Sequence, residues 1–238
     1  MKLAIIGYGR MGQAIEKLAE HSGHEVVLRI SADTADALTV DHLRQADVAV
    51  EFTSPESAVG HILLCFRAGV PVVSGTTGWL ADWSHVLAER SKHEAGFFYA
   101  SNFSIGVNIT FAVNKLLARL MNDQPDYAIR LEEVHHTGKL DAPSGTAIAL
   151  AEDILALVER KTGWVEASAR DAEDIPIVWR READVPGTHE VRYRSAIDTI
   201  TLRHEAHSRE GFARGALLAA EWMVGKKGHY GMSDLLGF

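Results

Sequence analysis

Residues 1–30 constrain the fold more than any other part of the chain. Residues 2–6 form a short apolar run with the character of a strand, residues 11–21 have helical periodicity, and residues 26–30 again resemble a strand. The first strand and the helix are joined by the run Gly7-Tyr8-Gly9-Arg10-Met11-Gly12. This order of a strand, a G-x-G-x-x-G run, a helix and a second strand is the context that a dinucleotide-binding fingerprint requires.

Each glycine of this run has a physical reason to be a glycine. Gly7 allows a tight turn, Gly9 lets a pyrophosphate approach the backbone, and Gly12 lets the helix pack closely on the sheet. The alternative is an ordinary glycine turn before a helix. The flanking strands and helix favour the dinucleotide site.

The residue that contacts the cofactor ribose is expected about 20 positions further on, at the end of the second strand. Ser31 stands there instead of an acidic residue. Asp33 could reach a 2′-hydroxyl group, whereas Arg10 and Arg29 could accept a 2′-phosphate. The sequence therefore predicts NADH or NADPH as cofactor and leaves the choice between them open.

Strands and helices continue to alternate up to residue 104, which predicts a doubly wound parallel sheet of the Rossmann type. Strands are expected at 46–53, 70–74 and 97–100, and helices at 56–68 and 80–92. The run Gly75-Thr76-Thr77-Gly78 follows one strand directly. Ligands of open α/β sheets bind at the carboxyl ends of the strands, so this loop is a second candidate for cofactor contact, although a plain turn is the alternative.

The pattern changes after residue 104. A long amphipathic helix is expected at 105–121, a strand at 127–134 and a helix at 146–160, and three strands follow without intervening helices, at 174–179, 188–193 and 199–205. Such an order predicts a second α+β domain with a mixed sheet. We therefore predict a dinucleotide-binding domain at 1–103, completed by 210–238 with its helix at 211–224, and a substrate-binding and oligomerisation domain at 104–209.

The stretch 132–147 carries the chemistry of this second domain. It contains His135, His136 and Lys139 and ends in Pro143-Ser144-Gly145-Thr146, with Ser144 or Thr146 as the expected N-cap of the next helix. The start of a helix binds anions through its free N–H groups, so a carboxylate could bond to the backbone of Gly145 and Thr146. Lys139 could donate a proton, and a histidine could do the same or stabilise an oxyanion.

Simpler interpretations of these residues compete with the catalytic one. Adjacent histidines are often structural, and Glu132 and Glu133 are expected to support the strand rather than to act as an acid–base pair. We predict no metal site, because no cysteine or third histidine is placed to complete one and His204 and His207 lie at a strand-to-helix junction.

Composition excludes several classes of protein. The net charge of −8 and the lack of a basic run argue against a nucleic-acid partner. No apolar run reaches the roughly 18 residues of a membrane span. Cys65 is the single cysteine, so no internal disulfide is possible and a cytoplasmic protein is expected.

Several of these motifs together resemble the 4-hydroxy-tetrahydrodipicolinate reductase family, also called dihydrodipicolinate reductase. The stretch from Glu133 to Ala147 resembles the family signature, and the resemblance covers essentially the whole chain. Further matching motifs, in the family's order, are Gly7–Gly12, Glu51-Phe52-Thr53, Gly75–Gly78 and Ala100-Ser101-Asn102-Phe103-Ser104.

The resemblance implies an enzyme of lysine and diaminopimelate biosynthesis. In such an enzyme (2S,4S)-4-hydroxy-2,3,4,5-tetrahydrodipicolinate, a small cyclic dicarboxylate, loses water and is reduced by NADH or NADPH to tetrahydrodipicolinate. It also implies a homotetramer, His135 as proton donor and acceptor, Lys139 as proton donor, and His136, Gly145 and Thr146 as substrate ligands. The residues it assigns to the cofactor are Gly7, Tyr8, Gly9, Arg10, Met11, Gly12, Ser31, Gly75, Thr76, Thr77, Ala100, Ser101, Asn102 and Phe103.

Two features depart from the family pattern. The region between Tyr193 and Thr199 is short, which bears on a tetramer formed through the second sheet, and Ser31 replaces an acidic residue. Two rival functions are a dehydrogenase of the aspartate or homoserine type and a non-catalytic nucleotide-sensing protein. Dehydrogenases of the aspartate or homoserine type lack the combination of His-His-x-x-Lys and Pro-Ser-Gly-Thr found at 135–146. A nucleotide-sensing protein without catalytic activity would be expected to have lost His135 or Lys139, and both are present.

Overall fold

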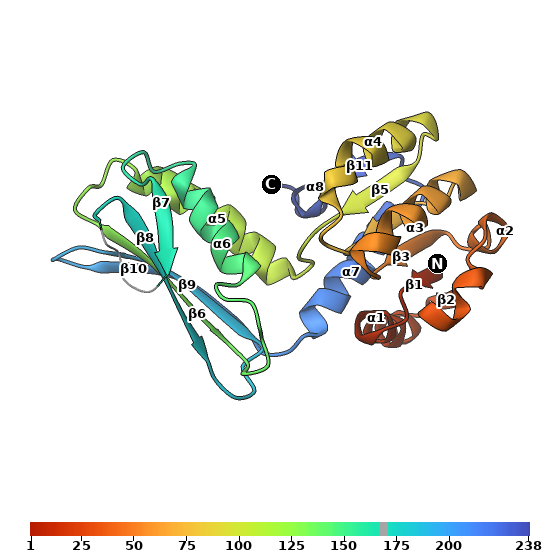
Figure 1. Cartoon of the computed structure of the whole chain (residues 1–238), viewed down its shortest axis with the longest axis horizontal. Helices are drawn as coiled ribbons and strands as arrows, with labels where there is room; N and C mark the ends of the chain where they lie inside the picture. Colours follow the sequence, from red (N-terminus) through yellow and green to blue (C-terminus); the bar gives the residue numbers. More distant parts are fainter. Residues whose placement is uncertain (167–170) are drawn as a thin grey trace. The chain divides into compact units, whose positions relative to one another are not determined.

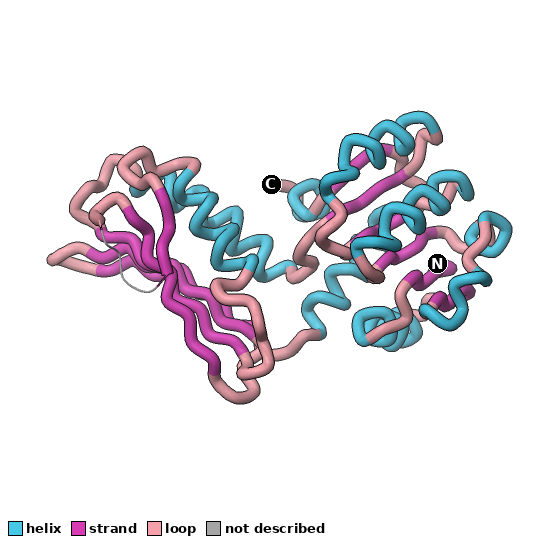
Figure 2. The backbone as a smooth tube through the Cα atoms, viewed as in Figure 1, coloured by secondary structure: helices cyan, strands magenta, loops and turns pink. Residues whose placement is uncertain are grey.

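The computed structural model describes residues 1–166 and 171–238 and divides them into two compact units. Unit 1 comprises Met1–Ile105 and Glu210–Phe238, and unit 2 comprises Gly106–Arg209. Figure 1 labels the helices and strands of both units, and Figure 2 separates helix, strand and loop by colour. No helix among the described residues is long and apolar enough to cross a membrane.

Unit 1 is built on a six-stranded sheet in the order β11-β5-β4-β3-β1-β2. Every pairing in it is parallel. This confirms the predicted doubly wound parallel sheet. The strands are β1 (Lys2–Ile6), β2 (Glu25–Ile30), β3 (Val48–Glu51), β4 (Val72–Ser74), β5 (Gly96–Tyr99) and β11 (Gly228–Tyr230).

Helices cover both faces of this sheet, because alternate side chains of a strand point to opposite sides. On β1, Leu3 and Ile5 belong to the core under α1 (Arg10–His21), α7 (Glu210–Met223) and α8 (Met232–Leu236). Ala4 and Ile6 belong to the opposite core. The elements on that side are η1 (Ala32–Ala37), α2 (Val40–Leu43), α3 (Pro55–Ala68), η2 (Leu80–Asp82) and α4 (Trp83–Lys92).

Three details of unit 1 differ from the prediction. The expected helix at 80–92 begins with a short 3-10 turn and becomes α-helical only at Trp83. The strand expected at 46–53 is confined to Val48–Glu51. β11 was not predicted because Gly228-His229-Tyr230 has no apolar run, and it is recognisable as a strand only through its pairing with β5.

Unit 2 contains a five-stranded mixed sheet in the order β10-β9-β6-β8-β7, which confirms the second predicted sheet. β6 pairs with β8 in parallel and with β9 in antiparallel orientation. The strands are β6 (Ala128–His135), β7 (Gly163–Glu166), β8 (Asp174–Arg181), β9 (Gly187–Arg194) and β10 (Thr199–Ala206). Two helices, α5 (Ile105–Met121) and α6 (Gly145–Leu155), pack on one face of this sheet. Ala118 of α5 and Leu150 of α6 share a core with Leu131, Ile177 and Val191 of the strands.

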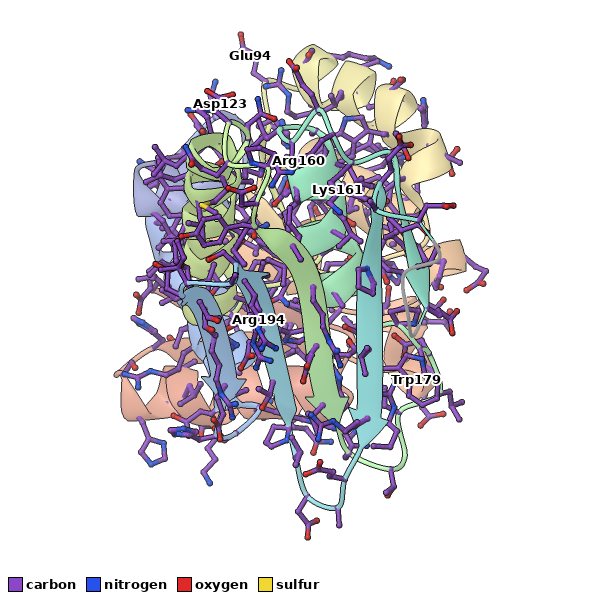
Figure 3. The ribbon with its side chains drawn as sticks, turned by 90° about the vertical axis from the view of Figure 1, so that its left-hand side faces the viewer. Glu94, Asp123, Arg160, Lys161, Trp179 and Arg194 are labelled. Atoms are coloured by element: carbon purple, nitrogen blue, oxygen red, sulfur yellow. The ribbon has the colours of Figure 1, made fainter. Side chains whose placement is uncertain are left out.

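On the opposite face of this sheet, the described part of the chain places no helix. Figure 3 looks onto that face, with the helices behind the strands and Trp179 near the carboxyl end of β8. Glu132 lies there with Arg130 and Arg180 in ion pairs of 3.0 Å each. Successive side chains of these strands therefore point alternately to the apolar core and to the charged face.

α6 is shorter than predicted. Its N-cap is Ser144, whose Oγ accepts a hydrogen bond from Ala147 N at 3.2 Å, and this decides between the two expected caps. The helix ends at Leu155 instead of residue 160. Val158 is nevertheless fully buried in the unit 2 core, so the apolar spacing continues beyond the end of the helix and misled the prediction.

Candidate functional site

The predicted cofactor residues of unit 1 follow the strands β1, β2, β4 and β5, and Arg10, Met11 and Gly12 already belong to the first turn of α1. Gly7 has a φ of +99°, and a Cβ there would overlap the carbonyl oxygen of Phe52. A Cβ on Gly12 would overlap the carbonyl oxygen of Gly7. At Gly9 a Cβ would meet no atom within 4 Å. Packing therefore requires glycine at 7 and 12, and Gly9 leaves the backbone at the start of α1 open, which fits the pyrophosphate of a dinucleotide.

The Gly75–Thr76 loop is held by a buried carboxylate. Glu51, which is fully buried at the end of β3, accepts hydrogen bonds from Ser74 Oγ at 2.6 Å and Thr76 Oγ1 at 2.7 Å. It also accepts from the backbone N–H of Thr53 at 3.0 Å and from the Thr53 hydroxyl. These donors are uncharged and come from two neighbouring loops, so Glu51 fixes the loops to each other.

The segment Ala100–Phe103 lies next to this loop. Ala100 N donates to Ser74 O at 3.3 Å, and the ring centroids of Phe52 and Phe103 are 5.5 Å apart. Gly75 is required here because a Cβ would overlap the Phe52 ring. The predicted loops after β3, β4 and β5 thus share one edge of the sheet, and Thr77 and Ser101 are exposed on it.

The end of β2 bears on the choice of cofactor. Ser31 caps η1, and its backbone N–H donates to Thr34 Oγ1 at 2.9 Å. Arg29 forms an ion pair with Glu16, which also accepts a hydrogen bond from the Tyr8 hydroxyl. The charge of Arg29 is therefore already paired, whereas Arg10 is exposed at the first position of α1.

In unit 2, Glu133 and His135 continue the buried face of β6. Glu133 is 1% exposed and His135 is 7% exposed. Glu133 Oε2 lies 3.7 Å from His135 Nδ1. Burial lowers the pKa of His135, the Glu133 carboxylate raises it, and Lys139 and Arg181 lower it further. The environment of this histidine thus favours the neutral form, with one carboxylate opposing that trend.

Glu133 also connects two other parts of the site. Its carboxylate oxygens accept hydrogen bonds from the backbone N–H of Ser144 at 3.1 and 3.0 Å. Arg181 Nη1 donates to Glu133 Oε1 at 3.3 Å. The expectation that Glu132 and Glu133 do not act as an acid–base pair agrees with this arrangement, but Glu133 contacts more than its own strand. The two side chains point to opposite faces, and Glu133 lies within the site.

His189 of β9 completes the buried group. Its Nε2 lies 3.1 Å from Ser144 Oγ and 3.7 Å from Glu133 Oε2, and its ring centroid is 4.9 Å from that of His135. Burial lowers the pKa of His189 to about 3, helped by His135 and His204, so the ring is neutral at pH 7. His204 stands opposite His189 on β10.

The sequence indicated no metal site, but strand pairing brings His189 beside His135 and Glu133, while His136 is not part of this group. Ligand atoms of Glu133, His135 and His189 lie within 4.8 Å of one another, so this group could hold a metal ion.

Lys139 and Asp141 lie on the loop between β6 and α6. Lys139 Nζ donates to the two Asp141 carboxylate oxygens at 2.7 and 2.6 Å, and this contact lowers the pKa of Asp141. Arg181 Nε donates to Lys139 O at 3.3 Å and its Nη2 donates to Asp141 O at 2.6 Å. Lys139 and His135 thus share Arg181 as a neighbour.

His136 lines an open pocket of about 410 Å³. Its Nε2 lies 2.8 Å from Arg209 Nη2. Gly145 is exposed at the start of α6, where a Cβ would meet no atom within 4 Å, and Thr146 is half-buried beside it. The other residues that line the pocket are Thr137, Ala183, Asp184, Val185, Pro186 and Arg209.

Sequence reasoning did not identify Arg181, His189 or Arg209 as site residues. Arg209 carried no signal, because it is an isolated basic residue after a strand. Arg181 and His189 reach the site only through strand pairings, in which Arg181 lies opposite His135 and His189 lies opposite Glu133.

A parallel nucleotide-binding sheet joined to a unit with cationic and proton-carrying groups at a helix start defines an NAD(P)H-dependent reductase. Residues 1–103 match the family model described as dihydrodipicolinate reductase, N-terminus, and residues 106–236 match the one described as dihydrodipicolinate reductase, C-terminus. The chain therefore belongs to the dihydrodipicolinate reductase family, whose members act in lysine and diaminopimelate biosynthesis with NADH or NADPH.

Individual relatives agree with this assignment. The chain is 45% identical over 236 residues to the 4-hydroxy-tetrahydrodipicolinate reductase of Christiangramia forsetii, with 99% of this chain and 98% of the relative covered. It is 33% identical to the enzyme of that name from Neisseria meningitidis serogroup B, with 100% and 97% covered. Its fold is similar to that of a dipicolinate-bound dihydrodipicolinate reductase from Paenisporosarcina sp. TG-14, with a TM-score of 0.80, 23% identity and 98% of both chains covered.

Proposed function

We propose that this reductase converts (2S,4S)-4-hydroxy-2,3,4,5-tetrahydrodipicolinate, with loss of water, to tetrahydrodipicolinate. The observation that carries the proposal is the loop between β6 and α6, which joins His135 and Lys139 to the open helix start at Gly145. A cyclic dicarboxylate needs such an anion site, and a reduced ring needs a nearby proton. The relatives named for this activity support the same substrate.

The cofactor is proposed to bind along the carboxyl edge of the six-stranded sheet. Residues 7–12 would take the pyrophosphate, because the start of α1 is open at Gly9. Residues 75–77 and 100–103 would line the remainder, and Ser31 would lie near the ribose. Bound NADH or NADPH supplies hydride to the substrate.

The substrate carboxylates are proposed to bind in unit 2. One would accept hydrogen bonds from the backbone N–H groups of Gly145 and Thr146 and from the Thr146 hydroxyl. His136 and Arg209 would contact a carboxylate at the open pocket that His136 lines, where the Arg209 guanidinium supplies charge and several donors. The dipicolinate bound in the Paenisporosarcina enzyme is a dicarboxylate of this kind.

Proton transfer is assigned to Lys139 and His135. The Lys139 ammonium carries three N–H donors and would protonate the position that becomes basic after reduction. Its partner Asp141 is 61% exposed and can release it to the substrate. His135, whose pKa is lowered by burial, is neutral at pH 7 and able to accept a proton before returning it.

A coupled assay tests this proposal. Substrate is made in situ from pyruvate and aspartate semialdehyde, and the loss of NADH or NADPH absorbance is followed separately. We expect substrate-dependent oxidation of at least one cofactor, and the ratio of the two kcat/KM values gives the cofactor preference. If neither is oxidised, the proposed reaction is excluded.

The proposal extends to a cytoplasmic homotetramer. The helix-free face of the unit 2 sheet carries Glu132 and Glu190 together with Arg130, Arg192 and Arg203, so two copies of this face can pair with alternating charges. Light scattering coupled to size-exclusion chromatography tests it. A mass of one or two chains at micromolar concentration would exclude the tetramer.

A further inference from the structure

Arg181 of β8 bonds to the backbone of the β6–α6 loop at two positions, although it was not among the side chains predicted to act there. Its guanidinium donates to the carbonyl oxygens of Lys139 and Asp141 and to the carboxylate of Glu133. Its own backbone neighbour Arg180 supplies a further carbonyl acceptor at 2.9 Å. The guanidinium also lies over the Trp179 ring, 5.1 Å from its centroid. All three nitrogens of this planar fork are thus in use.

The loop itself has few other attachments. Leu140 is 97% exposed and contributes nothing to the core. Among the described residues, a single backbone hydrogen bond lies within 136–142, and in it Lys139 N donates to His136 O at 3.1 Å. The loop carbonyls would otherwise be left to water, so Arg181 fixes the backbone on both sides of Leu140.

Glu133 secures the other end of the same segment. It accepts the Ser144 N–H with both oxygens, and Ser144 begins α6. The ion pair between Glu133 and Arg181 therefore ties the start of α6, the Lys139 carbonyl and two neighbouring strands into one buried arrangement. Arg181 has a side chain only 14% exposed and Glu133 is buried, so water screens this pair weakly.

We propose that Arg181 is a positioning residue that sets the backbone of the Lys139 loop relative to the helix start at Gly145. This inference rests on the proposed function, in which Lys139 donates a proton and Gly145 binds a carboxylate. The distance between these two groups must match a rigid ring. Misplacement of a catalytic group by about 1 Å can lower a rate roughly 100-fold. The Arg181 guanidinium, which is bonded to Glu133, also disfavours the binding of a metal cation between Glu133, His135 and His189.

The test compares Arg181→Lys with Arg180→Lys. Both change an arginine of β8 that contacts a neighbouring glutamate, but Arg180 lies on the opposite face with a side chain 59% exposed. Lysine keeps the charge beside Glu133 and cannot bond to both loop carbonyls and the carboxylate together. The variants are measured for kcat, the KM for NAD(P)H, dipicolinate affinity and amide hydrogen exchange.

For Arg181→Lys we expect kcat to fall about 100-fold and dipicolinate affinity about tenfold, with the KM for NAD(P)H within twofold of the parent. Amide exchange should accelerate in peptides that cover 137–146 and stay unchanged in the remaining strands of unit 2. Arg180→Lys should leave every one of these quantities within twofold.

Unchanged exchange at 137–146 in Arg181→Lys would overturn the proposal whatever the activity, and so would equal losses in the two variants. Stoichiometric zinc in the parent protein that disappears in Glu133→Gln would overturn it too, because a metal would then hold the carboxylate. A parent protein with neither turnover nor dipicolinate binding would instead exclude the proposed function, and the exchange result would still decide the role of Arg181.

Discussion

The least exposed acidic side chains among the described residues are Glu51, the last residue of β3 in unit 1, and Glu133, two residues before the end of β6 in unit 2. Glu51 is surrounded by hydroxyl and backbone donors. Glu133 faces Arg181, His135 and His189 as well as a backbone N–H. Uncharged hydrogen-bond donors surround the Glu51 carboxylate, whereas the Glu133 carboxylate is paired with an arginine.

This difference agrees with the roles proposed for the two units, which are cofactor binding in unit 1 and substrate binding with proton transfer in unit 2. A cofactor that arrives with its own chemistry needs shape, so unit 1 uses glycines, small hydroxyl residues and open backbone. A substrate that exchanges protons needs groups whose protonation can change, so unit 2 gathers ionisable side chains. Steric changes in unit 1 should therefore alter the affinity for NAD(P)H. Changes of charge in unit 2 should alter kcat and the pH dependence of kcat/KM.

The sharpest test of this division is Lys139→Ala. Removal of the proposed proton donor should lower kcat by about 100-fold to 10,000-fold, the usual contribution of a general acid. The dissociation constant for NADPH, measured by fluorescence, should stay within twofold, because Lys139 belongs to unit 2. Lys115→Ala, which removes a surface lysine of the same unit that pairs with Asp153, serves as the control. A large loss of cofactor affinity would contradict the division.

Glu133→Gln and Glu51→Gln form a matched pair. Loss of one partner of a buried ion pair costs about 3–5 kcal/mol, so Glu133→Gln should lower the free energy of unfolding by roughly 3 kcal/mol. Glu51→Gln should cost about 1.5 kcal/mol, because its hydroxyl donors can reorient. Chemical denaturation measures both.

Glu133→Gln and Glu51→Gln should also differ in their effect on the pH dependence of kcat/KM. Glu133 raises the pKa of His135 against burial, so its loss lets that pKa fall further, and the acidic limb of the kcat/KM profile should move to lower pH. The other groups that face His135 are Arg181, His189, Lys139 and Asp141. Glu51→Gln should leave the limb in place. An equal displacement in both variants would remove the distinction between the carboxylates.

Gly12→Ala and Gly60→Ala make the same chemical change, but we expect the first to lower the free energy of unfolding and the second to raise it. At Gly12 the new methyl group overlaps the carbonyl oxygen of Gly7, so the backbone must shift, at a cost of about 1–3 kcal/mol. We expect NADPH affinity to fall at least tenfold. At exposed Gly60 in α3 nothing lies within 4 Å, and alanine should add about 0.5–1 kcal/mol. Thermal unfolding and titration with NADPH measure the two effects.

His189→Gln tests the ionisable character of unit 2 through stability. The native pKa of His189 is about 3 and that of an unfolded histidine is about 6.5. Between these values the unfolded chain binds a proton that the native protein does not, so stability is complete above this window and falls as the pH is lowered through it. His189→Gln should reduce the slope of unfolding free energy between pH 4 and pH 6 by about 1.4 kcal/mol per pH unit. His207→Gln, an exposed histidine of the same unit, is the control.

The sequence predicted the parts of the fold that depend on local pattern. Alternating strands and helices predicted the parallel sheet of unit 1, and the run 7–12 indicated the edge of that sheet at which the cofactor is proposed to bind. The pairing of β6 with β8 could not be predicted, because parallel neighbours separated by α6 and β7 leave no local signal. Arg181 therefore remained unidentified beside His135, its partner in register.

One missed residue did carry a signal. Ile129 and Leu131 are buried on β6, and a period of two puts Glu133 and His135 on the same face. The alternation alone would have separated Glu133 from Glu132. The roles of Lys139, His135 and His136 stay predictions, and the structure places His135 at the end of β6 and the other two on the loop that follows.

The return of the chain from unit 2 to unit 1 has a consequence for biosynthesis. α7 supplies Ala213, Ala216, Leu217 and Met223 to the core that also contains Leu3 and Ile5 of the first strand. While the ribosome is still translating unit 2, α1 is the one helix of the three on this face that has already been made, so part of the face is uncovered. Unit 2 is continuous in sequence and can fold as soon as it emerges, whereas the nucleotide-binding unit begins first and finishes last. Until α7 and α8 are made, the first strands of unit 1 therefore keep an exposed apolar surface, and exposed apolar surface of this kind is what chaperones bind.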